Sequence, residues 1–540
     1  MDGNTLDIIT VIAYFVIILG IGFWSGRGKQ DSPENYFISK KSLSWWAIGA
    51  AYVATGLNSE QLIGMNGMAY MIGLPLVNSY FIAIFVYTAL IYFFFPLYLR
   101  NNIVTMPEYL GRRFNKQCRN IFSVMLLLSY IFLSLAVVLY GGAKLFEIIY
   151  DVPLWLGALI LGSVAGIYTI YGGMSSMISA SVFQFILMFA AGGFLFVLGY
   201  LQLPNGFEDI VTHAPGGFHL MQPMDYPVMP WHAVLLSFFS LQLFYSCINQ
   251  ALVQRGFGAK TEWDVRMAII FALGFVLLRP FLEVLPGMMA RALAFTGNNE
   301  FLLSSEQIDD VFPMLIENLV PAGLKGLILI GILGSVMSTI SAFLNSISTL
   351  FTYDIYKKWF NENADDKKLV KVGVISTFVL MVFSVVYAPI IGKLGGIFLY
   401  FQTASTYLAV PVATCFLFGM FWKRTTSTAA LTVLIIGIPL GILIQLVLIP
   451  LFFSPEIIQR YSLTNFYVAC GFTQFFCVLI IVGVSMYTKP KNIDEIRSLL
   501  WTKDLLKLPP HEKKRPIWQS VGLWWTIMAL IYATLYYLWW

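Results

Sequence analysis

Residues 45–73, WWAIGAAYVATGLNSEQLIGMNGMAYMIG, form an apolar stretch with a polar interruption at its centre. The stretch is long enough to cross a bilayer, because about 20 apolar residues span the hydrocarbon core. Its middle, residues 55–61, includes a glutamate, and a charged side chain at the bilayer centre costs about 2.5–3.5 kcal/mol even on mild insertion scales. A membrane helix keeps such residues where they face protein or a wet cavity. We interpret the stretch as half of a transport site; the alternative is a polar contact between packed helices.

The whole chain has the composition of a membrane protein. Of its 540 residues, 58% are hydrophobic and only 11% are charged, and apolar runs recur along the full length. We therefore expect an all-α integral membrane protein with about fourteen transmembrane helices. The expected spans are 6–25, 44–72, 76–98, 120–149, 153–171, 178–201, 232–252, 266–295, 324–353, 368–391, 395–420, 426–450, 463–487 and 519–539.

Lysine and arginine are concentrated in the loops that follow the odd-numbered spans. The richest of these loops are residues 26–43, 99–119 and 488–518. By the positive-inside rule these loops are cytoplasmic, which predicts a multi-pass protein of the plasma (inner) membrane with both termini extracytoplasmic. The net charge of +5 follows from this asymmetry and does not indicate a nucleic-acid partner.

The motifs of several other protein classes are missing from the sequence. No G-x-x-x-x-G-K-[ST] pattern occurs, which excludes a P-loop ATPase. The five cysteines show no paired or metal-ligand spacing, and no nucleophile with a neighbouring base is visible. We therefore expect neither enzymatic activity nor a cofactor.

A second polar interruption lies in the seventh expected span, where Gln242 is followed by the polar run 245–250. This span comes five spans after the first interrupted one, and an odd repeat of five inserts its second copy upside down. The pattern predicts a LeuT-type inverted repeat of five plus five helices, each half opening with a discontinuous helix. The predicted units are 1–43 (first helix and cytoplasmic loop), 44–201 (first repeat), 202–231 (extracytoplasmic loop), 232–420 (second repeat) and 421–540 (three additional helices).

The ninth expected span carries a row of hydroxyl groups. Ser335, Ser338 and Thr339 are spaced i, i+3 and i+4, so their side chains share one side of a helix. Two hydroxyls, a carbonyl of this helix and two carbonyls of a broken helix would give sodium five oxygen ligands. Hydroxyls bonded back to their own helix would produce the same pattern. Spacing alone leaves both interpretations open.

With these residues in view, the chain resembles the sodium/solute symporter family, and most closely its bacterial sodium/galactose branch. The similarity runs in one order along nearly the whole length. It is clearest at Asn35-Tyr36-Phe37, Ser59-Glu60-Gln61-Leu62-Ile63-Gly64-Met65, Tyr171-Gly172-Gly173, Asn249-Gln250, Val284-Leu285-Pro286-Gly287 and Phe421-Trp422-Lys423-Arg424.

The resemblance implies which residues bind sodium. They are two backbone carbonyls of the first broken helix and three groups of the ninth span: Ala54, Leu57, Ser335, Ser338 and Thr339. An aspartate that holds a second sodium in parts of the family aligns with Ser181, so we expect one sodium per substrate.

The resemblance also implies a sugar site. Gln61 and Gln402 match sugar-binding residues, and Tyr245 resembles the tyrosine that stacks under the sugar as an inner gate. Met65 and Phe398 match two outer-gate positions.

The departures from the galactose branch argue against galactose itself. At the positions where that branch has sugar-contacting or gating residues, this chain has Gly56, Ser79, Tyr80, Gln242 and Val276, and we expect Gly56 and Gln242 to contact the substrate here too. It has instead Arg279 and Glu283, four residues apart in the eighth span. Either these two only pair with each other, or Arg279 reaches the substrate and receives an anionic sugar.

The function expected from the sequence is sodium-coupled import of a monosaccharide or sugar-like solute by alternating access. Alternatives are the same fold carrying a polyol, an acidic sugar, a carboxylate or an osmolyte, and, more remotely, a transporter-like solute sensor or a channel. The expected partners are sodium, the solute and the lipid bilayer. The identity of the solute and the oligomeric state stay open.

Overall fold

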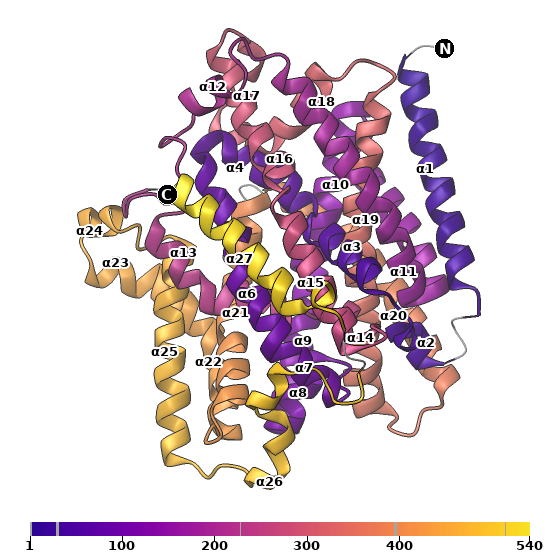
Figure 1. Ribbon diagram of the computed structural model, residues 1–540, viewed down its shortest axis with the longest axis vertical. Coiled ribbons are helices and arrows are strands. Elements are labelled where there is room, and N and C mark those ends of the chain that lie inside the picture. The colour runs from indigo at the N-terminus through magenta and orange to yellow at the C-terminus, as the bar shows by residue number, and fades with distance from the viewer. Residues whose placement is uncertain (1–2, 29–31, 227, 394–396, 513–514) are drawn as a thin grey trace.

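The computed structural model describes residues 3–28, 32–226, 228–393, 397–512 and 515–540. Within these ranges the fold is entirely helical, apart from two isolated backbone bridges. Figure 1 shows one bundle, with α1 (Gly3–Gly26) along one edge and α27 (Val521–Leu538) across the face towards the viewer. This architecture confirms the all-α fold class.

Ten helices of the described ranges are long and apolar enough to cross a membrane, or eleven if the bent pair within 231–257 counts as one span. This is fewer than the fourteen expected for two reasons. The predicted spans 153–171 and 178–201 lie within one 47-residue helix, α11 (Leu154–Tyr200). The predicted spans 44–72 and 266–295 are instead divided into shorter helices.

Gly173 bends α11 between the two predicted spans 153–171 and 178–201. Its φ of 53° and ψ of −136° lie in a region that residues with a Cβ rarely adopt. A Cβ added there would lie only 2.2 Å from the backbone oxygen of Tyr36 in α2 (Pro33–Ile38). The bend therefore requires a glycine, both for its torsion angles and for the close approach of α2.

The first predicted interruption is present. Helix α3 (Trp45–Gly56) ends at Leu57, whose φ of −101° and ψ of 73° leave the helical region. The chain resumes with a π-helical turn, η2 (Glu60–Gly64), and α4 (Met65–Ile72). Asn58 starts the second half, because its side-chain oxygen accepts a hydrogen bond from the Gln61 amide at 3.0 Å.

The second predicted interruption is also present. Helix α13 (Trp231–Ser237) is followed by two π-helical turns, η6 (Phe238–Gln242) and η7 (Phe244–Ile248), and then by α14 (Gln250–Phe257). The axis bends by 46° across this region. Asn249 adopts an extended conformation between η7 and α14, and its side chain accepts a hydrogen bond from the Ala251 amide.

A third interruption was not predicted. The eighth expected span is divided into α15 (Glu262–Val276), α16 (Pro280–Glu283) and α17 (Leu285–Phe295). Pro280 and Pro286 stand at the starts of α16 and α17, where their missing N–H groups cannot continue the preceding helix. Arg279 lies in the first of these breaks.

The long helix α19 (Lys325–Leu350) forms the centre of the bundle. Every residue from Ile328 to Leu350 is buried, whereas α27 at the periphery buries only Val521 and Tyr532. α19 packs against α1, α3, α10 and α11. The remaining helices are α5 (Asn78–Phe81), α6 (Ala83–Ala89), α7 (Phe95–Arg100), α8 (Met106–Arg113), α9 (Lys116–Ser129), α10 (Ala136–Tyr150), α12 (Phe207–Thr212), α18 (Val311–Leu319), α20 (Asp366–Tyr387), α21 (Ile397–Phe421), α22 (Ser427–Leu443), α23 (Ile449–Phe452), α24 (Pro455–Arg460), α25 (Phe466–Tyr487) and α26 (Ile493–Ile496).

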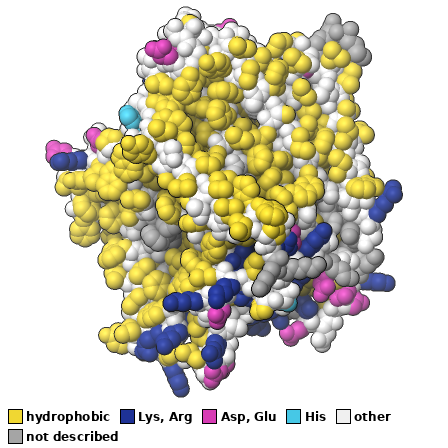
Figure 2. Space-filling view, viewed as in Figure 1, with side chains coloured by type: hydrophobic (Ala, Val, Ile, Leu, Met, Phe, Trp, Pro, Cys, Tyr) yellow, Lys and Arg dark blue, Asp and Glu magenta, His cyan; other side chains and the backbone are white. Residues whose placement is uncertain are grey.

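Positive side chains gather at one end of the molecule. In Figure 2 lysine and arginine lie mainly across the lower part of the visible face, below a broad hydrophobic region. The same end carries α2, α8 and α26 in Figure 1. We call it the basic end.

Replacing Gly173 by alanine should lower the thermal unfolding midpoint of the purified protein. The substitution places a Cβ against the Tyr36 carbonyl in a disfavoured backbone conformation, so we expect a loss of about 1–3 kcal/mol or more. Gly193 in the same helix is the matched control, because nothing lies within 4 Å of its added Cβ. Equal unfolding midpoints for Gly173→Ala and Gly193→Ala would contradict this account of the bend.

Candidate functional site

A small cavity of about 110 Å³ lies beside the first broken helix. All six residues predicted to contact substrate line it: Gly56, Gln61, Gln242, Tyr245, Arg279 and Gln402. They come from α3, the turn η2, the π-helical turns η6 and η7, the break before α16, and α21. The cavity is therefore formed where three interrupted helices meet a continuous one.

Arg279 joins a buried ion pair to the wall of this cavity. Its Nε and Nη2 atoms donate hydrogen bonds to the Glu283 carboxylate at 2.9 and 2.8 Å. Nη2 also donates to the Gly56 carbonyl and to the side-chain oxygen of Gln61, both at 3.1 Å. The guanidinium lies 4.5 Å from the ring centroid of Tyr80. The two residues thus pair with each other, and Arg279 also contacts the cavity wall.

Glu60 adds a second carboxylate that sequence reasoning did not assign to the cavity. The residue is fully buried, and its Oε2 atom accepts a hydrogen bond from the Gln61 amide group at 2.6 Å. Its Oε1 atom has no hydrogen-bond partner within the described ranges. The signal in the sequence was the glutamate at the centre of an apolar span, which is costly unless it serves a site.

Three further cavity-lining groups are buried without partners in the described part of the chain: the side-chain oxygen of Gln402 and the hydroxyls of Tyr80 and Tyr245. A buried polar atom left unpaired costs about 1–3 kcal/mol. Together with Glu60 these atoms are suited to receive the polar groups of a ligand. A molecule rich in hydroxyls fits them, because a hydroxyl both donates and accepts.

The predicted gate residues occupy two different places. Tyr245 lines the cavity, and its ring stacks on Phe401 with centroids 5.9 Å apart and planes inclined by 24°. Met65 and Phe398 are buried outside the described lining of the cavity. The hydroxyl of Ser79 donates to the Met65 sulfur at 3.7 Å, and Phe398 packs close to Gly64.

The residues predicted to bind sodium lie where α3 ends against α19. The Thr339 hydroxyl is 3.1 Å from the Thr55 carbonyl and 3.1 Å from the Ser335 carbonyl of its own helix. The Ser338 hydroxyl is 3.4 Å from the Thr55 hydroxyl and 2.7 Å from that of Ser181.

The remaining predicted ligands border the same junction. The Ser335 hydroxyl is buried without a hydrogen-bond partner in the described ranges, and Ala54 and Leu57 are fully buried in the last turn of α3. The contacts of Thr339 agree with both earlier interpretations, since its hydroxyl lies near a carbonyl of the broken helix as well as near a carbonyl of its own helix. Neutral oxygens of α3 and α19 thus lie close together at this junction, and the sodium ligand set stays a prediction.

Comparison with known proteins supports a transport site. The family model described as "Sodium:solute symporter family" matches residues 36–437. The sodium/glucose cotransporter of Vibrio parahaemolyticus is 31% identical over 525 residues, which cover 92% of this chain and 94% of that protein. The mouse sodium/myo-inositol cotransporter 2 is 28% identical over 536 residues, covering 92% and 79% of the two chains.

A solved structure of a sodium-coupled sialic acid symporter, in a substrate-bound outward-open state, has the same fold. It superposes with a TM-score of 0.76 at 20% sequence identity and covers 90% of this chain and 99% of its own.

Removing Arg279 alone should destabilise the protein more than removing the whole ion pair. Arg279→Met leaves the Glu283 carboxylate buried and unpaired, which costs about 3–5 kcal/mol, whereas Arg279→Met combined with Glu283→Leu leaves no buried charge. The thermal unfolding midpoint in detergent measures the difference. The exposed pair of Lys358 and Glu362 provides the control, and Lys358→Met should have little effect. A double variant no more stable than Arg279→Met would contradict the pairing.

Proposed function

Because this chain belongs to the sodium:solute symporter family, we propose that it imports a neutral monosaccharide or a closely related sugar-like solute together with sodium. The observation that carries the proposal is the buried cavity beside the broken helix, lined by Gln61, Tyr245 and Gln402. The relatives named above are cotransporters of glucose and of myo-inositol, which are both neutral polyhydroxylated compounds. The cavity offers amide groups and an aromatic face to a ligand of this kind.

The proposed architecture has fourteen membrane crossings: the broken helices 45–72, 231–257 and 262–295 each count as one, and the bent helix α11 counts as two. Residues 44–201 and 232–420 form the inverted halves, and both termini are extracytoplasmic. Three observations support this proposal: the interruptions open equivalent spans of the two halves, the basic end holds the loops rich in lysine and arginine, and discontinuous helices are typical of such transporters.

One sodium would be bound by the carbonyls of Ala54 and Leu57 together with Ser335, Ser338 and Thr339. The contacts of Thr339 and Ser338 with Thr55 support this assignment, because they bring α19 against the last turn of α3. Ser181 adds only a neutral hydroxyl beside Ser338, which favours a single ion. Bound sodium would fix the end of α3 against α19 and so stabilise the state in which the cavity is complete.

The charges around the cavity favour a neutral solute. Arg279 already donates to Glu283, Gly56 and Gln61, so its guanidinium has little capacity left for a ligand carboxylate. Glu60 stands in the same wall with an unpartnered oxygen, and in its ionised form it would repel an anion. Donors on a neutral sugar ring would instead pair with Glu60 and Gln402.

An acidic sugar is the second candidate. It is favoured by the arginine in the cavity wall and by the solved symporter of the same fold, which is described as a sialic acid carrier. Binding an acidic sugar would require the ligand to replace at least one of the groups that Arg279 contacts. A polyol, a carboxylate or an osmolyte is a further candidate for the same machinery, and a sensor or a channel is the remote alternative.

Replacing Thr339 by alanine should raise the sodium concentration for half-maximal uptake at least about tenfold, because the buried ion would lose a ligand that water cannot easily replace. Uptake by the protein reconstituted in liposomes, measured over a range of sodium concentrations, gives this value. Ser348→Ala is the matched control, since it also removes a buried hydroxyl from α19, one that has no hydrogen-bond partner in the described ranges. A Thr339→Ala variant with the sodium dependence of the Ser348→Ala variant would refute the assignment.

Replacing Gln402 by alanine should raise the KM for a neutral monosaccharide about tenfold, the effect of losing one hydrogen bond worth about 1.4 kcal/mol. Gln445→Ala is the control variant, because Gln445 forms hydrogen bonds with Tyr407 and Thr464 outside the cavity. It tests whether the loss of a glutamine outside the cavity also changes the KM. Competition by labelled neutral sugars and by a uronate identifies the class of solute. Sodium-driven uptake of the uronate that is lost in Arg279→Met would favour the acidic sugar instead.

A further inference from the structure

Two hollows adjoin each other at the basic end, and neither shares a lining residue with the transport cavity. The first, of about 450 Å³, is lined by Lys41, Arg100, Lys260, Glu262, Glu512 and Arg515, among others. The second is an apolar groove of about 650 Å³, lined by Trp45, Trp263, Phe271, Gly274, Trp518 and Met528, among others. One hollow is therefore polar and the other almost wholly apolar.

Trp263 lies where the two hollows meet. The guanidinium of Arg515, from the wall of the polar cavity, stacks over its ring at 3.8 Å from the centroid. The indole N–H donates to the carbonyl of Gln519, in the wall of the groove, at 2.8 Å. Trp263 and Arg515 thus connect the wall of the polar cavity to the wall of the groove.

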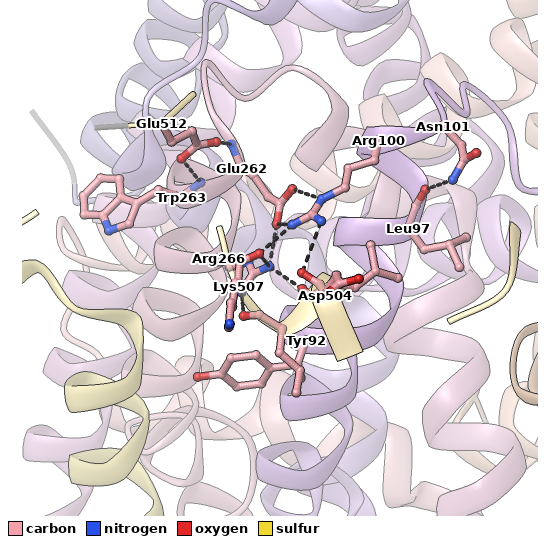
Figure 3. A network of polar contacts seen from close by, with 12 residues as sticks. Tyr92, Leu97, Arg100, Asn101, Glu262, Trp263, Arg266, Asp504, Lys507 and Glu512 are labelled. Atoms are coloured by element: carbon pink, nitrogen blue, oxygen red, sulfur yellow. Dashed lines mark hydrogen bonds and ion pairs between the residues drawn. The ribbon is translucent and has the colours of Figure 1, made fainter. Parts of the chain in front are cut away.

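The acidic groups of the polar cavity already have partners, as Figure 3 shows. The Glu512 carboxylate accepts hydrogen bonds from the backbone amides of Glu262 and Trp263, at 2.7 and 3.3 Å, and so caps the start of α15. Glu262 pairs with Arg100 at 2.9 Å and also with Arg266. Glu262 therefore has cationic partners of its own, and among the described lining residues Glu512 is the one negative charge left to set against the remaining cations of the cavity.

Three cations of this cavity have no acidic partner within the described ranges: Lys41, Lys260 and Arg515. Lys41 donates to the neutral side-chain oxygen of Asn102 at 3.2 Å, and Arg515 lies 3.4 Å from the amide oxygen of Gln519. All three side chains are exposed. The polar cavity therefore carries an uncompensated positive charge that an anion would complement.

The groove lies at the level where a membrane surface is expected. It runs between α15 and α27, and tryptophans gather around it: Trp45, Trp263, Trp518 and Trp524. Tryptophan is enriched at membrane–water interfaces, and the positive-inside rule assigns this end of the molecule to the cytoplasm. Cationic pockets beside transmembrane helices on the cytoplasmic side are typical binding sites for acidic lipid headgroups.

We propose that these two hollows form a binding site for one anionic phospholipid. Lys41, Lys260 and Arg515 contact the headgroup phosphate, and an acyl chain lies in the groove along Gly274 and Met528. The lipid would connect the loop before α3, the start of α15 and the C-terminal segment before α27. This site is independent of the solute that the protein carries.

The charge half of the proposal is tested with a variant in which Lys41, Lys260 and Arg515 are all replaced by glutamine. Native mass spectrometry of the full chain, titrated with phosphatidylglycerol or with phosphatidylcholine, measures retention of each lipid. We expect retention of phosphatidylglycerol to fall by about fivefold for each cation removed, with little change for phosphatidylcholine. The matched control replaces Lys367, Lys368 and Lys371, three exposed lysines of α20, by glutamine. An equal loss in the control, or no loss in the variant, would overturn the site.

The groove half is tested with Gly274→Leu, which changes no charge. An added Cβ at Gly274 meets only Met528, at 3.8 Å, so the larger side chain has room to fold into the groove. It should displace the acyl chain and weaken retention of phosphatidylglycerol several-fold. Gly193→Leu is the control, because its added Cβ meets nothing within 4 Å and the position lies outside the groove lining. Unchanged retention in Gly274→Leu, or inorganic phosphate binding as tightly as the lipid, would show that no lipid site exists here.

Discussion

The structure depends on how the first broken helix is held at its break. In a membrane, a carbonyl released from a helix is costly unless another group satisfies it. Two consecutive carbonyls at the end of α3 have such partners: that of Thr55 lies within hydrogen-bond distance of the Thr339 hydroxyl of α19, and that of Gly56 accepts from Arg279. The break is thus fixed from one side by the centre of the bundle and from the other by the interrupted eighth span.

This arrangement explains how an ion and a solute can be coupled without touching each other. The proposed sodium ligands Ala54 and Leu57 and the cavity-lining Gly56 lie within four consecutive residues of one chain segment. An ion that fixes this segment against α19 also fixes the position of the cavity wall. Because linkage is reciprocal, a solute that stabilises the same geometry must raise the affinity for sodium by the same factor.

The sequence predicted those features that leave a mark in residue chemistry. Polar residues inside apolar spans revealed the first two breaks, and the i, i+3, i+4 spacing predicted that Ser335, Ser338 and Thr339 share one side of a helix. The third break was missed although Pro280 and Pro286 mark it, because Arg279 and Glu283 were interpreted as residues four apart on one continuous helix. Glu60 was noticed as a costly charge, but which of its oxygens is left unpartnered depends on tertiary packing. The burial of Met65 and Phe398 outside the cavity lining likewise depends on the packing of α4 and α21.

The most direct measurement of the central claim is the uptake of a labelled neutral monosaccharide into liposomes containing the purified protein, under an inward sodium gradient. Our account predicts saturable accumulation inside the liposomes above the external concentration, abolished when potassium replaces sodium or when the sodium gradient is collapsed. Uptake that only equilibrates the sugar across the membrane, or accumulation that is indifferent to sodium, would contradict it.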